Sequence, residues 1–172
     1  MSAAPAGHLS AGAPAPAAAP PSRSIYLHPG KIYAGAEPAV VTTILGSCVA
    51  VCLWDAGRGV GGINHYLLPH WAAGSEATAR YGNVALRALL DRVVALGARR
   101  DALQAKVFGG ACVLDAFRPG QGATHLGERN SELAVHFLAS ESIRVVASDV
   151  GGSRGRKLIF RTDDGTALVR AI

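Results

Sequence analysis

The sequence of 172 residues contains few aromatic side chains, few charged side chains and only three cysteines. Aromatic residues make up 6% of the chain, and its net charge of +5 is spread along the length rather than gathered into a basic stripe. Nucleic-acid binding usually requires such a stripe interleaved with aromatic residues, so we expect no nucleic-acid partner. The apolar runs are too short to cross a bilayer, which argues against membrane insertion.

Several motifs that mark cofactor sites are also missing. The chain has no glycine motif that cradles phosphates, no Cys-x-x-Cys pair, no heptad pattern and no internal repeat. Cys48, Cys52 and His65 could supply three zinc ligands, but no fourth ligand occurs at a recognisable spacing. We therefore expect neither a metal nor an organic cofactor.

The first part of the chain differs in composition from the rest. Met1 to Ser22 is dominated by alanine and proline and lacks the basic and apolar regions of a secretory signal. We predict a disordered tail over residues 1–23 and one folded domain over residues 24–172. Without an export signal, three cysteines that cannot all pair are expected to stay reduced in the cytoplasm.

Hydrophobic periodicity predicts an α+β fold for this domain. Apolar residues at three- and four-residue spacing predict helices over 83–96 and 131–140, the second capped by Asn130. Residues 30–37 are expected to form a glycine-bearing connection. Short apolar runs predict strands over 24–27, 39–43, 49–54, 60–68, 103–108, 143–148, 157–161 and 167–172. The expected architecture is a single domain with a mixed, largely antiparallel sheet or sandwich and about two packed helices.

Two of these strands, 49–54 and 60–68, are expected to form a hairpin, with Cys48 directly before the first and His65 in the second. The turn composition of Asp55 to Arg58 places its centre between Ala56 and Gly57, and Cys48 and His65 are symmetric about that point. Directly opposed residues have Cβ atoms about 4.5 to 5.5 Å apart. An imidazole at that distance can lower the pKa of a thiol and activate it as a nucleophile.

This pairing suggests catalysis without deciding it. A buried cysteine is more often a small apolar core residue, and a buried histidine is more often a hydrogen-bonded structural one. Cys52 and Cys112 have no evident base and are interpreted as core residues. Gly46 and Ser47 would allow the backbone to approach a substrate, so the Cys48 amide could help to hold an oxyanion.

Longer motifs around these residues resemble a known family. The segments are LGSCVAVC at 45–52, GGINHYLLP at 61–69, RYGN at 80–83, KVFGGA at 106–111, LGERN at 126–130 and DVGGSRGRK at 149–157. They resemble CheD, the family of chemoreceptor glutamine deamidases. The resemblance extends from about Gly30 to Ile172 and leaves only the tail outside.

The resemblance implies a cysteine-hydrolase-like fold and a catalytic Cys-His-Thr set. Cys48 and His65 take the first two places, and Thr42, six residues before the cysteine, takes the third, with Thr43 as an adjacent rival. The implied enzyme is a protein-glutamine glutaminase, which converts receptor glutamines to glutamate through a cysteine thioester and releases ammonia. It needs no cofactor and acts in chemotaxis adaptation.

The resemblance also implies partners. These are the helical cytoplasmic domains of chemoreceptors and, where one is present, a CheC-type phosphatase. The turn with Gly151, Gly152 and Arg154 is a candidate partner-binding surface, although its glycines could serve backbone geometry alone. Two other functions stay open: a mainly non-catalytic module that regulates receptors or the phosphatase, and a transglutaminase or cysteine protease with related acyl-enzyme chemistry.

Overall fold

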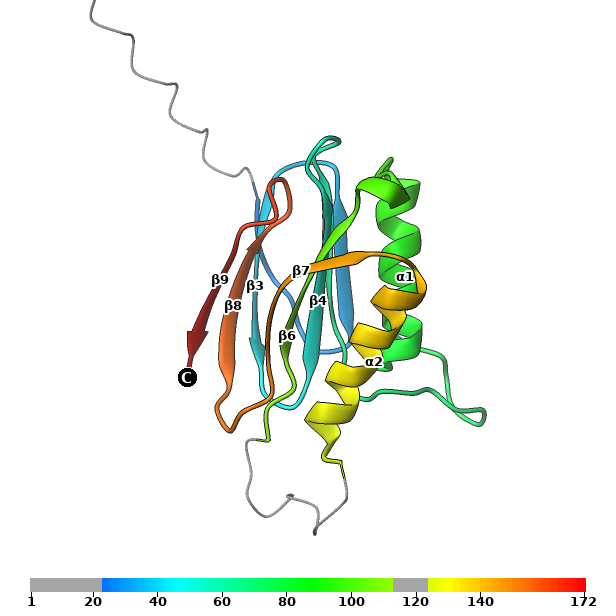
Figure 1. Ribbon diagram of the computed structural model, residues 1–172, viewed down its shortest axis with the longest axis vertical. Helices are drawn as coiled ribbons and strands as arrows, with labels where there is room; N and C mark the ends of the chain where they lie inside the picture. Colours follow the sequence, from blue (N-terminus) through cyan, green and yellow to red (C-terminus); the bar gives the residue numbers. More distant parts are fainter. Residues whose placement is uncertain (1–22, 113–123) are drawn as a thin grey trace, which may run out of the picture.

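The computed structural model describes residues 23–112 and 124–172, and within them the chain forms three layers. Two helices cover one face of a five-stranded sheet, and a four-stranded sheet packs against its other face (Figure 1). The expected α+β single domain is therefore confirmed. The predicted tail lies outside the described residues except for Arg23, which begins the first strand.

The four-stranded sheet has the order β1-β3-β8-β9. Its strands are β1 (Arg23–Tyr26), β3 (Ala39–Leu45), β8 (Arg156–Arg161) and β9 (Ala167–Ala171). β1 runs parallel to β3, and the other pairs are antiparallel. Along β3, Val41, Thr43 and Leu45 are buried, while Thr42 and Ile44 point to the other face.

The five-stranded sheet has the order β2-β5-β4-β6-β7. Its strands are β2 (Lys31–Gly35), β5 (Val60–His65), β4 (Val49–Asp55), β6 (Gln104–Gly109) and β7 (Arg144–Val150). Every residue of β4 and β5 is buried. These strands are covered on both faces, which is why they appear in the sequence as continuous apolar runs rather than as alternating ones.

The two helices are α1 (Gly82–Ala95) and α2 (Leu126–Ser140), with a short 3-10 turn, η1 (Arg100–Ala102), before β6. Leu86, Leu89 and Leu90 of α1 lie in the core against the five-stranded sheet, and Ala134 and Leu138 of α2 join the same cluster. Neither helix combines the length and the hydropathy that a membrane span needs, within the ranges that the structure describes.

Two elements differ from the sequence prediction. β2 occupies part of the segment that is expected to be a connection. The sequence does not predict this strand, because its half-exposed residues have no clear polar–apolar alternation and glycines lie at its ends. The second helix begins at Leu126, so Asn130 lies inside it and is not its cap. His125 takes that place, and its side chain accepts a hydrogen bond from the Glu128 amide at 3.1 Å.

Candidate active site

Cys48 and His65 lie at the same end of the two-sheet sandwich. Cys48 ends a short link, Gly46 to Cys48, that joins β3 of one sheet to β4 of the other, and His65 is the last residue of β5. The half-buried Cys48 packs against the apolar cluster between the two sheets. His65 has the same strand parity as Ile63, a member of that cluster, so its ring also faces the space between the sheets.

The register of the hairpin differs from the sequence prediction. Val49 bridges Tyr66 and Cys52 pairs with Ile63, which brings His65 opposite Ala50. Cys48 is therefore a diagonal neighbour of His65, and the expected direct opposition is wrong. The physical cause is the turn, in which Asp55 accepts hydrogen bonds from two turn amides and shifts the centre of the hairpin.

A diagonal pair on one sheet face has a Cα separation of about 7 to 8 Å, which long side chains can bridge. No hydrogen bond joins the Cys48 sulfur to His65 in the part of the chain that the structure describes. Catalytic hydrogen bonds are often long in substrate-free structures and shorten when a substrate binds. The arrangement is therefore compatible with proton transfer from the thiol to the ring.

The hydrogen bonds of Thr43 assign the tautomer of His65. The Thr43 hydroxyl donates its single hydrogen to the Leu27 carbonyl at 2.7 Å, and the same oxygen lies 2.8 Å from His65 Nδ1. The ring must then donate from Nδ1, because the hydroxyl has no second hydrogen. This leaves His65 Nε2 as the basic nitrogen, and that atom is buried without a hydrogen-bond partner among the described residues.

Thr43, not Thr42, contacts the histidine ring. Thr43 is fully buried between the sheets, whereas Thr42 is half-exposed and points to the outer face of the four-stranded sheet. The preference for Thr42 rested on its offset from Cys48, and this structure does not place that residue beside His65. Strand alternation within β3 explains this placement, because Val41 and Leu45 lie on the same buried face of the strand as Thr43.

Burial shifts both titrating groups toward their neutral forms. Desolvation lowers the pKa of His65 to about 4, and the Leu27 carbonyl opposes the shift only in part. Desolvation also raises the pKa of the Cys48 thiol, while its own backbone N–H acts in the opposite direction. The substrate-free pair is therefore a neutral thiol and a neutral imidazole, and not a preformed ion pair.

The link that carries Cys48 is held through its carbonyl groups. The Gly110 amide donates to the Cys48 carbonyl at 2.9 Å, and the Ala111 amide donates to the Gly46 carbonyl at 2.8 Å. The Asn130 side chain donates to the Ser47 carbonyl at 3.0 Å. All three carbonyls are bound by α2 or by the segment directly after β6. The Cys48 amide lies near its own sulfur, where an oxyanion donor would be needed.

Gly109 permits this close packing. It has φ of 109°, and a Cβ there would lie 2.2 Å from the Cys48 carbonyl oxygen. Any side chain at this position would therefore displace the backbone of Cys48. The sequence offered one signal for this contact, a Gly-Gly pair directly after a predicted strand.

Asn130 connects the two halves of the candidate site. Its buried amide nitrogen donates to the Ser47 carbonyl at 3.0 Å and to the Leu67 carbonyl at 2.9 Å. Its main-chain carbonyl accepts a hydrogen bond from the Tyr66 hydroxyl at 2.5 Å. One α2 side chain thus fixes the segment just before Cys48 to the segment just after His65.

The turn with Gly151, Gly152 and Arg154 lies beside this end of β6. The Gly152 carbonyl accepts from the Cys112 amide at 2.8 Å, and Arg154 is exposed. The buried guanidinium of Arg156 binds Asp149 and the Gly151 carbonyl, both at 2.8 Å. The sequence gives no signal that separates this structural arginine from the exposed Arg154.

Cys52 is fully buried, and burial raises the pKa of its thiol, as expected for a core residue. No group of three metal-ligating side chains occurs within residues 23–112 and 124–172.

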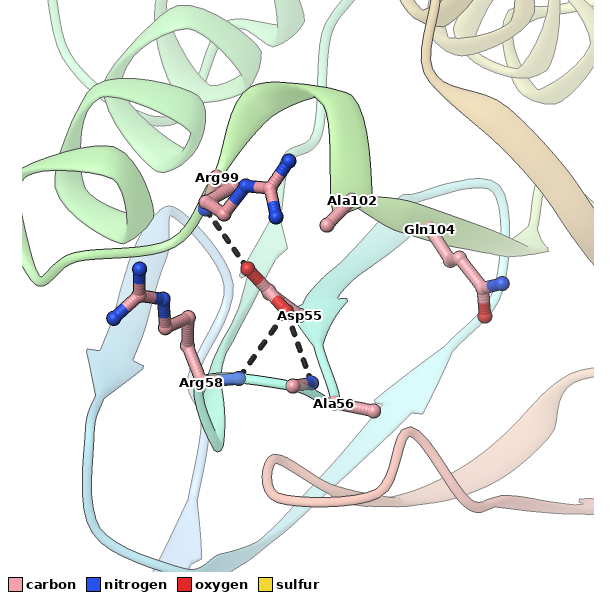
Figure 2. Close-up of a pocket in the computed structure, with 7 residues that line it drawn as sticks. Asp55, Ala56, Arg58, Arg99, Ala102 and Gln104 are labelled. Atoms are coloured by element: carbon pink, nitrogen blue, oxygen red, sulfur yellow. Dashed lines mark hydrogen bonds between the residues drawn. The ribbon is translucent and has the colours of Figure 1, made fainter.

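A pocket of about 260 Å³ lies at the far end of β4 from Cys48. There Asp55 accepts hydrogen bonds from the amides of its own turn and of Arg99 (Figure 2).

Comparisons with known proteins agree on one family. The family model described as CheD chemotactic sensory transduction matches residues 67–171. A probable chemoreceptor glutamine deamidase CheD 1 of Anaeromyxobacter dehalogenans is 53% identical over 148 residues, which cover 86% of this chain and 84% of that protein. A probable chemoreceptor glutamine deamidase CheD of Trichlorobacter lovleyi is 48% identical over 149 residues, covering 87% and 91%.

A solved structure gives a much weaker match. The crystal structure of a Neisseria meningitidis protein of the DUF152 family has a TM-score of 0.40 and 12% identity. The superposition covers 70% of this chain and 60% of the Neisseria meningitidis chain. A likeness at this level carries no functional weight.

Proposed function

This chain belongs to the CheD family, and we propose that it converts glutamine side chains of chemoreceptors to glutamate and releases ammonia. The observation that carries the proposal is the hydrogen-bonded series from Leu27 through Thr43 to His65. It leaves Nε2 of His65 as a free base on the sheet face that Cys48 shares. A cysteine nucleophile with a base of fixed tautomer is sufficient machinery for amide hydrolysis.

In the proposed reaction, His65 Nε2 accepts the Cys48 proton as the sulfur attacks the carboxamide carbon. The C–S bond forms, and the Cys48 amide stabilises the negative oxygen of the tetrahedral intermediate. The imidazolium then protonates the departing nitrogen, which leaves as ammonia, and a thioester remains. His65 next deprotonates a water molecule whose oxygen attacks the thioester, giving glutamate and restoring the thiol.

A neutral resting pair supports the proposed role of His65 as a general base. Because the pKa of His65 is held near 4, the ring is unprotonated at neutral pH and ready to accept the thiol proton. Thr43 accepts the Nδ1 hydrogen in each stage, so the ring keeps one orientation while Nε2 gains and loses its proton. Thr43 thus takes the third place of the set in this proposal.

The product changes the charge of the receptor. Each deamidation replaces a neutral amide by a carboxylate in a helical bundle, which alters receptor signalling through local electrostatics. The proposal places this reaction in the cytoplasm, without a cofactor. It also includes a CheC-type phosphatase as a partner, with the exposed turn of Gly151, Gly152 and Arg154 as one contact surface.

The reaction can be tested by incubating the full chain with a receptor cytoplasmic fragment and measuring the mass of each glutamine peptide. We expect specific peptides to gain about one dalton per modified glutamine, with equimolar ammonia. Binding of the fragment without any mass gain would instead support a non-catalytic regulatory module.

The same incubation separates the related chemistries. A primary amine added to the mixture would appear in amide cross-links if the thioester were transferred to amines rather than to water. Cleaved backbone fragments would indicate proteolysis. Either product in place of glutamate would overturn the assignment to deamidation.

Asn130 provides a test of how the site is held together. Replacing Asn130 with aspartate should lower kcat about tenfold and change KM by less than about threefold, because a carboxylate cannot donate to the Ser47 and Leu67 carbonyls. Lowering the pH should recover part of the loss, since a protonated carboxyl regains one donor. Steady-state kinetics across pH measure both effects.

Leu138→Ala is the matched control for Asn130. It removes a buried side chain from the same helix and costs about 2 to 5 kcal/mol of stability without touching the link or β5. Assayed below its melting temperature, it should keep the wild-type kcat and pH profile. If Leu138→Ala reproduced the Asn130→Asp kinetics, Asn130 would be a stability residue and not a positioning residue.

A further inference from the structure

The outer face of the four-stranded sheet is open. The helices lie on the far side of the five-stranded sheet, and no described element covers β1, β3, β8 and β9 from outside (Figure 1). Strand alternation directs Thr42 and Ile44 of β3 to this face, and register places Lys157 and Arg170 beside Ile44 in one row. Tyr26, Ile159 and Leu168 align with Thr42 in the next row.

Large apolar side chains on this face are exposed to water. Tyr26 is 51% exposed, Ile44 is 47% exposed and Leu168 is 62% exposed. They come from three different strands, so they form part of one surface rather than a single hydrophobic loop. Contiguous exposed apolar surface rimmed by polar residues marks an interaction site more often than a solvated face.

The charges on this face have one sign. Lys157, Arg161 and Arg170 are cationic, and none of the four strands contains an aspartate or glutamate. Arg161 is paired with Asp163 and Asp164 of the adjoining turn. Among the described residues, Lys157 and Arg170 have no ion-pair partner, so their charges are available to an anionic ligand.

The face adjoins the candidate active site. Ile44 lies on β3 four residues before Cys48, a path of at most about 14 Å along an extended chain. Four strands spaced about 4.8 Å apart span about 14 Å, enough for one helix about 10 to 12 Å in diameter. A helix on this face could therefore lie next to a second segment that reaches Cys48.

We infer that the outer face of the four-stranded sheet is a docking site for an acidic amphipathic helix of the chemoreceptor cytoplasmic domain. This inference rests on the proposed function for the identity of the partner. Tyr26, Ile44 and Leu168 contact the apolar side of the helix, and Lys157 and Arg170 pair with its carboxylates. Docking there raises the local concentration of receptor glutamines at Cys48 without contributing to the chemical step.

The double variant Lys157→Glu/Arg170→Glu tests the docking site. Titration calorimetry of the full chain against a receptor cytoplasmic fragment should show binding weakened about tenfold or more, since repulsion replaces attraction at two positions. Leu168→Ser should weaken the same binding by about threefold to tenfold. Turnover of a short glutamine peptide, too small to reach the face, should stay within about twofold of wild type.

A matched control carries the same change of charge elsewhere. Arg58→Glu/Arg144→Glu alters two exposed arginines of the other sheet and should bind the fragment about as well as wild type, within a factor of about three. Equal loss in both doubles would mean that net charge alone governs binding, and unchanged binding in the first double would exclude this face. Loss of peptide turnover in parallel with binding, in a variant with an unchanged melting temperature, would show that the face supports the catalytic site and not docking, and would overturn the assignment.

Two further results would also overturn it. Absence of binding between the wild-type chain and the receptor fragment excludes the stated partner. Sedimentation that shows wild-type dimers, dissociated by Leu168→Ser, would assign the face to a second copy of the chain. Because calorimetry does not depend on chemistry, a failure of deamidation with retained, charge-sensitive binding would contradict the proposed function alone.

Discussion

Replacing Cys48 with alanine should reduce glutamine deamidation by at least about 10⁴-fold while leaving receptor binding intact. The reason is that Cys48 is a half-buried thiol on the same sheet face as His65, whose Nε2 is free to accept the thiol proton. In the proposed mechanism the sulfur forms the acyl intermediate, so its loss removes the reaction path and not only its efficiency. Ammonia release and peptide mass measure the effect, and calorimetry with the receptor fragment verifies that the variant is folded and binds.

Cys52→Ala is the control for loss of a thiol. Cys52 is fully buried on the same sheet face, and its substitution should cost about 1 kcal/mol of stability while turnover stays within about threefold of wild type. Activity near wild type in Cys48→Ala would refute the nucleophile assignment. Activity lost equally in both variants would point to a general effect of cavities between the sheets.

Thr43→Val should lower kcat by about 100-fold, whereas Thr42→Val should stay within about threefold of wild type. Valine has nearly the shape of threonine but cannot accept the Nδ1 hydrogen, so the ring loses its fixed tautomer and Nε2 no longer remains the basic nitrogen. Thr42→Val makes the same chemical change one residue away, on the outer face. Steady-state kinetics with a short glutamine peptide keep receptor docking out of the comparison.

Thr43→Ser supplies the rescue for this pair. Serine retains the hydroxyl and should recover most of the kcat that valine loses, with some loss from greater rotamer freedom. The opposite ranking, with Thr42→Val inactive and Thr43→Val active, would show that the offset from Cys48 identifies the third residue better than this geometry does. It would also imply a different arrangement of β3 when substrate is bound.

Much of the fold could be predicted because its elements have strong local signals. The periodic leucines of α1 and the apolar runs of β4 and β6 each indicate one kind of element, and the structure differs from those ranges only at the ends. β2 could not be predicted, since its pairing with β5 provides the order that its own residues do not indicate.

The candidate site could be predicted as a set of residues but not as a geometry. Symmetry about a turn locates Cys48 and His65 near one another, but the side-chain bonds of Asp55 that set the true register depend on the folded turn. The sequence does not show which of Thr42 and Thr43 faces the core. Ile44 is apolar although it points outward, so β3 lacks a clear alternation of polar and apolar residues. Asn130 has the composition of a helix cap, and only tertiary contact reveals that its amide binds Ser47 and Leu67.

The neutral state of the Cys48 thiol should protect it from oxidation by peroxide. Peroxide and electrophiles react with thiolates, and burial raises the pKa of Cys48, so little thiolate is present between catalytic cycles. In the proposed mechanism its sulfur becomes reactive only while a substrate is bound and His65 accepts the proton. Oxidative damage should therefore be limited to the short periods of turnover, and chemotactic adaptation should continue under peroxide stress that inactivates enzymes with permanently ionised cysteines.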